Sequence, residues 1–193
     1  MLYSGIYRRE RAVEYARQWA FARNPLFYDF SAFGGDCTSF VSQCVYAGSC
    51  MMNFTPILGW YYISPDDRTA SFSGVEYLYD FLVNNQGVGP YATETDAEGI
   101  ALGDVIELGN SDGGYYHTLL AVGWGEDGGI LVAAHTNDAF ARPLSTYSYD
   151  AVRYLHVEGV RYPDEGSGDC YPSLLAGEQL LLIGAGEVLG AGG

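Results

Sequence analysis

Apolar residues recur at helical spacing in three segments of the first half of the chain. These segments are residues 7–24, 37–47 and 73–84. Pro25 ends the first segment, because proline cannot continue a helix. Asp36 suits an N-cap and Gly48 a C-terminal stop, so the second helix is expected to begin at or next to residue 37. Ser73 and Glu76 form a capping box, which predicts the start of the third helix.

The pattern changes after residue 103 to short apolar runs separated by Gly/Asp turns, which indicates consecutive antiparallel strands. The expected strands are residues 105–108, 117–124, 130–135 and 152–157. Helices followed by strands predict an α+β domain over residues 1–158. Residues 159–193 form a Gly- and Leu-rich tail that either docks on the domain or is disordered.

Composition and charge narrow the classes of function. Of the 193 residues 48% are hydrophobic and 17% are charged, which is enough apolar side chain for a core and too little charge for a disordered chain. Nine cations, all arginine, stand against 24 acids and give a net charge of −15. A surface this acidic repels phosphate backbones, so nucleic acid and membrane surfaces are poor partners. We expect a monomer, although the tail could serve self-association.

The sequence also allows expectations about the cellular location and about the state of the cysteines. No apolar run approaches the roughly 20 residues that span a bilayer, and the N-terminal residues show no export signal. As it stands the chain predicts a cytoplasmic protein, or a cell-wall or extracellular one if it is a shortened form. The four cysteines lack the density of a disulfide scaffold and the paired spacing of a metal site, so we expect mostly free thiols. No cofactor and no metal are expected.

Gly34 to Val41 (GGDCTSFV) carries the most informative chemistry. A cysteine is a nucleophile as its thiolate, and the first turn of a helix favours the anion, so Cys37 is expected to have a lowered pKa. The two glycines allow the tight turn that exposes the sulfur, and the N–H of Cys37 is a candidate oxyanion donor. A buried structural thiol is the alternative interpretation.

A thiol nucleophile needs a base, and the chain has three histidines. His117 opens an apolar strand after a polar loop and is the candidate base. The next strand ends in His135, and we expect this residue to orient the base, with Asn137 and Asp138 as alternatives. His156 is expected to be structural, and each of the other histidines could equally be a satisfied sheet residue.

These residues resemble a known family. GGDCTSFVSQCVYAG, GVEYLYDFL, GDVIEL, YYHTLLAV and AAHTND followed by RPLSTY are similar to the bacterial "putative amidase domain" family, in the NlpC-type branch of the papain-like cysteine peptidases. The resemblance covers about residues 7–157. It implies a papain-like fold and amide hydrolysis through an acyl-enzyme on Cys37, with His117 as base and His135 as orienting residue. The implied substrate is a peptide of the peptidoglycan type.

Two points depart from the pattern. The family is usually secreted or wall-associated, whereas no leader is visible here. Papain has a glutamine shortly before its cysteine as second oxyanion donor, and here Tyr28 is the candidate. Trp60, Tyr61 and Tyr116 are candidates to line a substrate cleft. A non-catalytic binding module on the same fold, and an acyltransferase with the same Cys/His pair, stay open as alternatives.

Overall fold

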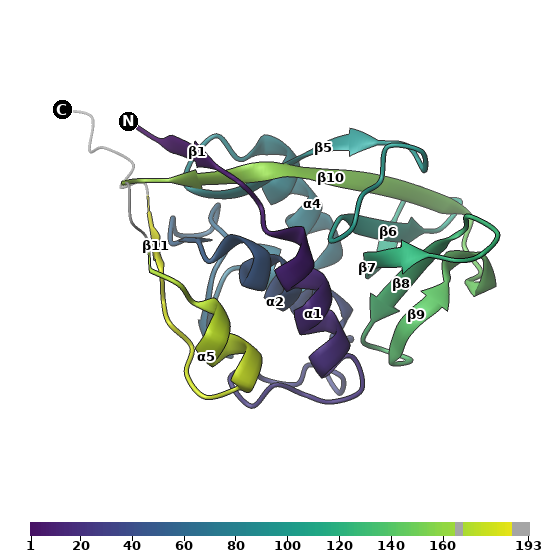
Figure 1. Ribbon diagram of the computed structural model, residues 1–193, viewed down its shortest axis with the longest axis horizontal. Helices are drawn as coiled ribbons and strands as arrows, with labels where there is room; N and C mark the ends of the chain where they lie inside the picture. Colours follow the sequence, from purple (N-terminus) through teal and green to yellow (C-terminus); the bar gives the residue numbers. More distant parts are fainter. Residues whose placement is uncertain (165–167, 187–193) are drawn as a thin grey trace.

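The computed structural model describes residues 1–164 and 168–186, and within them it is a mixed α+β protein (Figure 1). The helices are α1 (Arg9–Trp19), α2 (Cys37–Ser49), α3 (Ala70–Ser73), α4 (Val75–Asn84) and α5 (Tyr171–Ala176), with a 3-10 turn η1 (Leu144–Thr146). The strands of the main sheet are β1 (Tyr3–Gly5), β5 (Gly89–Thr95), β6 (Val105–Gly109), β7 (Tyr115–Trp124), β8 (Ile130–Ala134), β9 (Ala139–Pro143) and β10 (Ala151–Tyr162). Two small pairs complete the list: β2 (Met52–Asn53) with β11 (Gly184–Ala185), and β3 (Tyr62–Ser64) with β4 (Asp67–Arg68).

All pairings within the seven-stranded sheet are antiparallel. The path runs β1-β10-β6-β7-β8-β9, and β5 pairs with β10 off this path. The long strand β10 therefore pairs with three strands, with β6 and β1 along one edge and β5 along the other (Figure 1). No helix among the described residues is long and apolar enough to cross a membrane.

Strands β6 to β8 bury side chains on both faces, which places them between two hydrophobic cores. Alternate residues of a strand point to opposite faces. Leu120 accordingly belongs to the larger core beneath the helices, and Leu119 belongs to the smaller core on the other face. The same alternation gives the two faces of β7 different chemical surroundings.

Helix α2 is the centre of the helical layer, and every one of its residues is buried. It begins at Cys37, as expected from the sequence, and it follows two glycines with positive φ: 97° at Gly34 and 113° at Gly35. Side chains are strained in this left-handed region, so glycine is required for the turn into the helix. The helix ends at Cys50, which adopts the left-handed conformation with φ 45°.

Several expectations about helix ends are wrong. The carboxylate of Asp36 makes no capping hydrogen bond, because it is used by His135 and by the N–H of Phe30. The expected capping box at Ser73 and Glu76 does not form either, because a separate short helix, α3, ends at Ser73. The side chain of Glu76 instead accepts the N–H of Tyr115.

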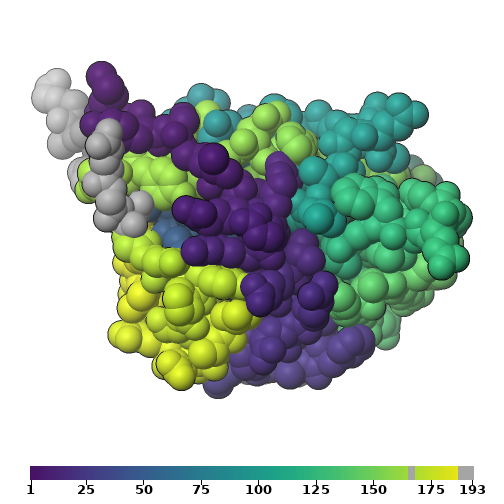
Figure 2. All heavy atoms as spheres, viewed as in Figure 1, coloured from purple at the N-terminus to yellow at the C-terminus, as the bar shows by residue number. Residues whose placement is uncertain are grey.

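The described part of the predicted tail docks on the helical layer. Leu174 and Cys170 are buried in the larger core, and the Arg11 guanidinium pairs with Asp169. Figure 2 shows the C-terminal segment in yellow packed beside the N-terminal helix in purple. Strand β11 pairs with β2, and the predicted boundary at residue 158 falls inside β10. Residues 165–167 and 187–193 of the tail lie outside the described residues.

The expectation of mostly free thiols is wrong for half of the cysteines. Cys50 and Cys170 form a disulfide across a sequence separation of 120, and Cys37 and Cys44 are free. Both bonded residues sit where spacing alone gives no warning, because one ends α2 and the other precedes α5. The bond ties the C-terminal segment to the end of α2.

Candidate functional site

Cys37 is the first residue of α2, and its side chain is almost covered. The residue is 7% exposed. The first N–H groups of a helix have no partner within the helix, so the backbone N–H of Cys37 is free to act as a donor at this end. Burial is the main cause that raises the pKa of the Cys37 thiol, and the nearby Asp36 charge adds to it. The expectation of a lowered pKa is therefore wrong for the substrate-free state.

The thiol lies against strand β7 at Thr118. Hydrogen bonds with the backbone of Thr118 and with Thr38 act to lower the pKa of the thiol, but burial outweighs them. The Oγ1 atoms of Thr38 and Thr118 are 2.8 Å apart and both residues are buried. This pair of hydroxyls fixes the start of α2 against the strand that carries His117.

His117 comes immediately before Thr118 and pairs with Leu108 on β6. Successive side chains alternate between faces, so His117 is directed away from the face that Thr118 presents to α2. Its ring lies 6.0 Å from the ring of Tyr147, measured between centroids. Among the described residues no hydrogen bond reaches its ring, and no contact joins it to the Cys37 sulfur. Burial lowers the pKa of His117 to about 4, and the positive charge of Arg142 acts in the same direction.

His135 follows β8 and lies on the helical side, where both of its ring nitrogens are occupied. Nδ1 lies 2.6 Å from Oδ2 of Asp36, and Nε2 lies 2.9 Å from the carbonyl oxygen of Trp19. Its ring stacks on Phe40 with the centroids 3.9 Å apart. A carbonyl only accepts, so Nε2 carries a hydrogen, and one further proton is shared between Nδ1 and the carboxylate. The structure thus brings His135 to the residue before Cys37 and not to His117.

The two alternatives to His135 also lie on the side of the loop that precedes α2. Asp138 forms a bidentate pair with Arg23, with both N to O distances at 3.0 Å. The Nε atom of Arg23 is 3.7 Å from Oδ2 of Asp36. Asn137 is exposed, has φ 63°, and makes no side-chain hydrogen bond with the described residues. None of these side chains contacts His117.

The four aromatic candidates have different surroundings. Trp60 is fully buried, donates to Oγ of Ser42 and offers no surface to a substrate. Tyr61 is partly buried and its hydroxyl donates to Asp67, 3.2 Å away. Tyr116 is 45% exposed on β7. Tyr28 is 41% exposed, and no contact joins its hydroxyl to Cys37 in the described part of the chain.

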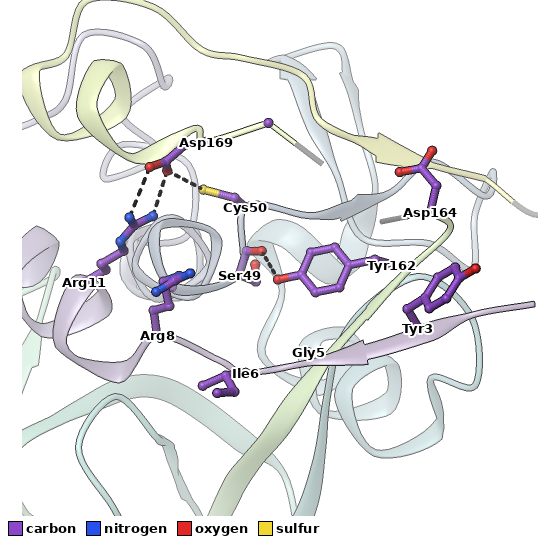
Figure 3. A pocket seen from close by; sticks show the side chains of 12 residues that line it. Tyr3, Gly5, Ile6, Arg8, Arg11, Ser49, Cys50, Tyr162, Asp164 and Asp169 are labelled. Carbon is purple, nitrogen blue, oxygen red and sulfur yellow. Dashed lines mark hydrogen bonds and ion pairs between the residues drawn. The ribbon is translucent and has the colours of Figure 1, made fainter. Parts of the chain in front are cut away.

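Two pockets lie away from these residues. One has a volume of about 520 Å³ and is formed at the opposite end of α2 from Cys37, among Arg8, Arg11, Ser49 and Asp169. Figure 3 shows the two arginines on one wall, with Arg11 turned to Asp169. The other, of about 770 Å³, lies between α4 and the loop of Ile57. Neither pocket includes a predicted site residue.

The roles of several residues around the site were not predicted from the sequence. The part of Asp36 in holding His135 was missed because its place before the helix suggested a cap. Thr38 and Thr118 gave no signal, since the contact between them depends on how α2 packs on β7. The effect of the Arg142 charge on His117 was missed too, although Arg142 is the first residue of the RPLSTY sequence that formed part of the resemblance.

Comparison with known proteins places the chain in a family. The family described as "Putative amidase domain" matches residues 6–157, and the chain belongs to it. A domain of this kind suggests an amide hydrolase. The chain is also 30% identical over 138 residues to "Uncharacterized protein YhbB" of Bacillus subtilis (strain 168). That match covers 70% of this chain and 43% of the relative. No solved structure matches the chain.

Proposed function

We propose that this protein is a cysteine-dependent amide hydrolase with a papain-like arrangement, in which Cys37 is the nucleophile and His117 the general base. The observation that carries the proposal is the position of Cys37 at the first residue of a buried helix, against the strand residue next to His117. Membership in the amidase family supports the same chemistry. We propose a peptide of the peptidoglycan type as the substrate.

In the proposed reaction His117 takes the thiol proton as Sγ attacks the amide carbonyl carbon. The proton passes to the leaving nitrogen, the C–N bond breaks, and an acyl-thioester stays on Cys37. Water activated by His117 then cleaves the thioester, which releases the acid and restores the thiol. The backbone N–H of Cys37 supplies one donor for the developing oxyanion. Tyr28 is proposed as the second donor, through its hydroxyl.

In the substrate-free site the Cys37 thiol and the His117 imidazole are both uncharged. Burial raises the pKa of the Cys37 thiol, and it lowers the pKa of His117 to about 4, so neither group is charged near neutral pH. An unprotonated imidazole is the form that a base requires. Catalytic contacts in substrate-free enzymes are often long and tighten when substrate binds. Catalysis here requires a rearrangement of the backbone at the start of β7 that turns the ring of His117 toward the sulfur, because its side chain otherwise lies on the other face of the strand.

We propose that His135 is a positioning residue that acts on Cys37 through Asp36. The pair between them is almost completely buried, with side chains 1% exposed, and it joins the loop before α2 to the end of β8. Trp19 adds the end of α1 to the same contact. Three elements thereby fix the start of α2, which supports a role in holding the nucleophile rather than in orienting the base.

The disulfide supports a location outside the reducing cytosol, because such bonds persist in oxidising compartments. We therefore propose a wall-associated or extracellular protein. Quantifying the thiols of the protein isolated from its source tests this point. Two free thiols per chain support it, and four contradict it.

The proposed activity is tested by incubating the protein with a library of N-acetyl tripeptides of L and D residues and detecting new amines. Cys37→Ala and His117→Ala are compared with the intact protein, and the Cys44→Ala variant serves as the thiol control because Cys44 is buried in the core. Cleavage that both site variants lose and the control retains supports the proposal. If no peptide is cleaved and Cys37 resists alkylation, the protein is a binding module instead.

A further inference from the structure

The turn that joins β8 to β9 contains two successive residues in the left-handed conformation. Thr136 and Asn137 both have a φ of 63°. Asparagine tolerates this region, whereas a β-branched side chain such as that of threonine is strained there. Thr136 is also exposed, so burial of its methyl group does not explain why threonine occupies this position. Strain at one residue of a tight turn points to a role for its side chain.

The hydroxyl of Thr136 contacts the main chain directly before the proposed nucleophile. Its Oγ1 atom accepts the backbone N–H of Asp36, with the nitrogen and the oxygen 3.3 Å apart. Asp36 is 1% exposed, and no other acceptor reaches this N–H among the described residues. A buried backbone N–H without a partner is costly, so Thr136 supplies a contact that this part of the loop needs.

The same hydroxyl lies close to Gly35. A Cβ atom added at Gly35 would lie 3.3 Å from Oγ1 of Thr136, and Gly35 has a φ of 113°. Glycine allows the loop both this conformation and its close approach to the turn. One oxygen atom of Thr136 therefore lies beside both residues that lead into Cys37.

Asp36 is held from the same turn by its side chain and by its main chain. The carboxylate pairs with His135, and the N–H bonds Thr136. The side-chain pair alone does not fix the planar peptide unit between residues 35 and 36, whereas a hydrogen bond to its N–H does. The direction of this unit determines where the backbone enters α2, and hence where Sγ of Cys37 lies.

Resting on the proposed function, we infer that Thr136 is a positioning residue, whose hydroxyl fixes the peptide unit before Asp36 and thereby holds Cys37 in place for attack on the amide carbonyl. The strain at Thr136 follows from placing a hydroxyl at a point of the turn where glycine or asparagine would be relaxed. A nucleophile displaced by about 1 Å reacts much more slowly. Loss of the hydroxyl should therefore lower kcat and leave KM almost unchanged.

The test compares variants that separate the hydroxyl from the shape of the side chain. Thr136→Val removes the hydroxyl and keeps the branched side chain, whereas Thr136→Ser keeps the hydroxyl. For an N-acetyl tripeptide that the intact protein cleaves, we expect kcat to fall about tenfold in Thr136→Val, with KM within about twofold. In Thr136→Ser kcat should stay within about twofold. An unchanged kcat in Thr136→Val, or an equal loss in Thr136→Ser, overturns the inference.

Glycine variants cover the case in which Thr136→Val does not fold. Thr136→Gly removes the hydroxyl and the strain together, so it should fold and still lose about tenfold in kcat. Ala141→Gly is the matched control, because Ala141 lies on β9 of the same hairpin with a φ of 57°, and no hydrogen bond joins it to the loop before α2 in the described chain. A similar loss of kcat in both glycine variants assigns the effect to backbone conformation and overturns the role of the hydroxyl.

A second readout does not require a substrate. Cys37 is 7% exposed, so a loosened start of α2 should expose its sulfur. Alkylation of Cys37 by iodoacetamide at pH 8 should become at least about threefold faster in Thr136→Val and Thr136→Gly, but not in Thr136→Ser or Ala141→Gly. The fully buried Cys44 is the internal control, because it is labelled only when the fold opens.

The outcomes for the two hypotheses are distinct. An unchanged rate of Cys37 alkylation in Thr136→Val and Thr136→Gly overturns the inference and leaves the proposed function standing. If the intact protein cleaves no peptide, the proposed function fails, whereas faster alkylation confined to these two variants still supports the placement of Cys37 by Thr136.

Discussion

The two ends of α2 are held in different ways. At its beginning, Asp36 and His135 form a buried pair, and Thr38 bonds Thr118, so the contacts are non-covalent and crowd around a free thiol. At its end, Cys50 is bonded to Cys170, beside the ion pair of Arg11 with Asp169. The difference agrees with the proposed function, because a nucleophile must be placed by contacts that leave it free, whereas a disulfide only has to hold two segments together.

Removal of the thiol tests the beginning of α2. Cys37→Ala should abolish amide cleavage, by at least about a thousandfold, because loss of a nucleophile removes the covalent route. The free energy of unfolding should change by less than about 1 kcal/mol, since only one sulfur atom is lost. Kinetic assays and denaturant melts check both values. An active Cys37→Ala variant would show that the start of α2 holds no nucleophile.

Removal of the disulfide tests the other end. The double variant Cys50→Ser, Cys170→Ser should lose about 2–4 kcal/mol of stability, because the bond closes a long loop and constrains the unfolded chain. Activity at low temperature should persist, since Cys37 lies at the opposite end of the helix. Guanidinium denaturation with parallel rate measurements gives both quantities. A loss of activity that exceeds the unfolded fraction would mean that the two ends are coupled.

Asp36→Asn tests the non-covalent contacts at the beginning of α2. We expect a stability loss of about 2 kcal/mol, because the buried imidazole of His135 loses its charged partner. The rate should fall about tenfold as well, because the loop before Cys37 is loosened. Asp104→Asn is the reference variant. Asp104 also pairs with a histidine, with its Oδ2 atom 2.7 Å from Nδ1 of His156, and this pair does not contact Cys37. Equal rates for the two variants would remove the positioning role of Asp36.

The smallest expected effect is the change of kcat/KM with pH in mild acid. The pKa of His117 is lowered to about 4, so its proton-free form persists through pH 5 and kcat/KM should fall there by less than about twofold. Below pH 4 the ring becomes protonated and the rate should fall with each further unit. The measurement is a pH profile between 3 and 9, corrected for unfolding. A midpoint near 6.5 would mean that His117 is solvated in the working enzyme.

Sequence alone predicted the start of α2 at Cys37, because glycines, a polar residue and a helical apolar run meet there. It also located most strands of the sheet. Strand β5 was missed because Gly89–Thr95 begins with glycine and proline and is mostly polar, and β1 was missed because it is short and exposed. Both strands form only because the long strand β10 lies beside them.

The relative placement of the candidate site residues could not be predicted from the sequence. Whether a histidine at a strand end faces the helices depends on the phase of the pleat, and the register of β6 with β7 shifts just before His117. The sequence cannot fix that phase. The Cys50–Cys170 pairing likewise depends on the return of the C-terminal segment to α2 across a separation of 120.

The central claim, that Cys37 carries an acyl group during amide cleavage, is tested most directly by trapping that group. The protein is mixed with a cleaved peptide, quenched in acid within the first turnovers, and analysed by intact mass and by peptide mapping. We predict a mass increase equal to the acyl portion, located on the peptide that contains Cys37 and absent from Cys37→Ala. Cleavage that proceeds with no adduct on Cys37, or with the adduct on another residue, would contradict the account.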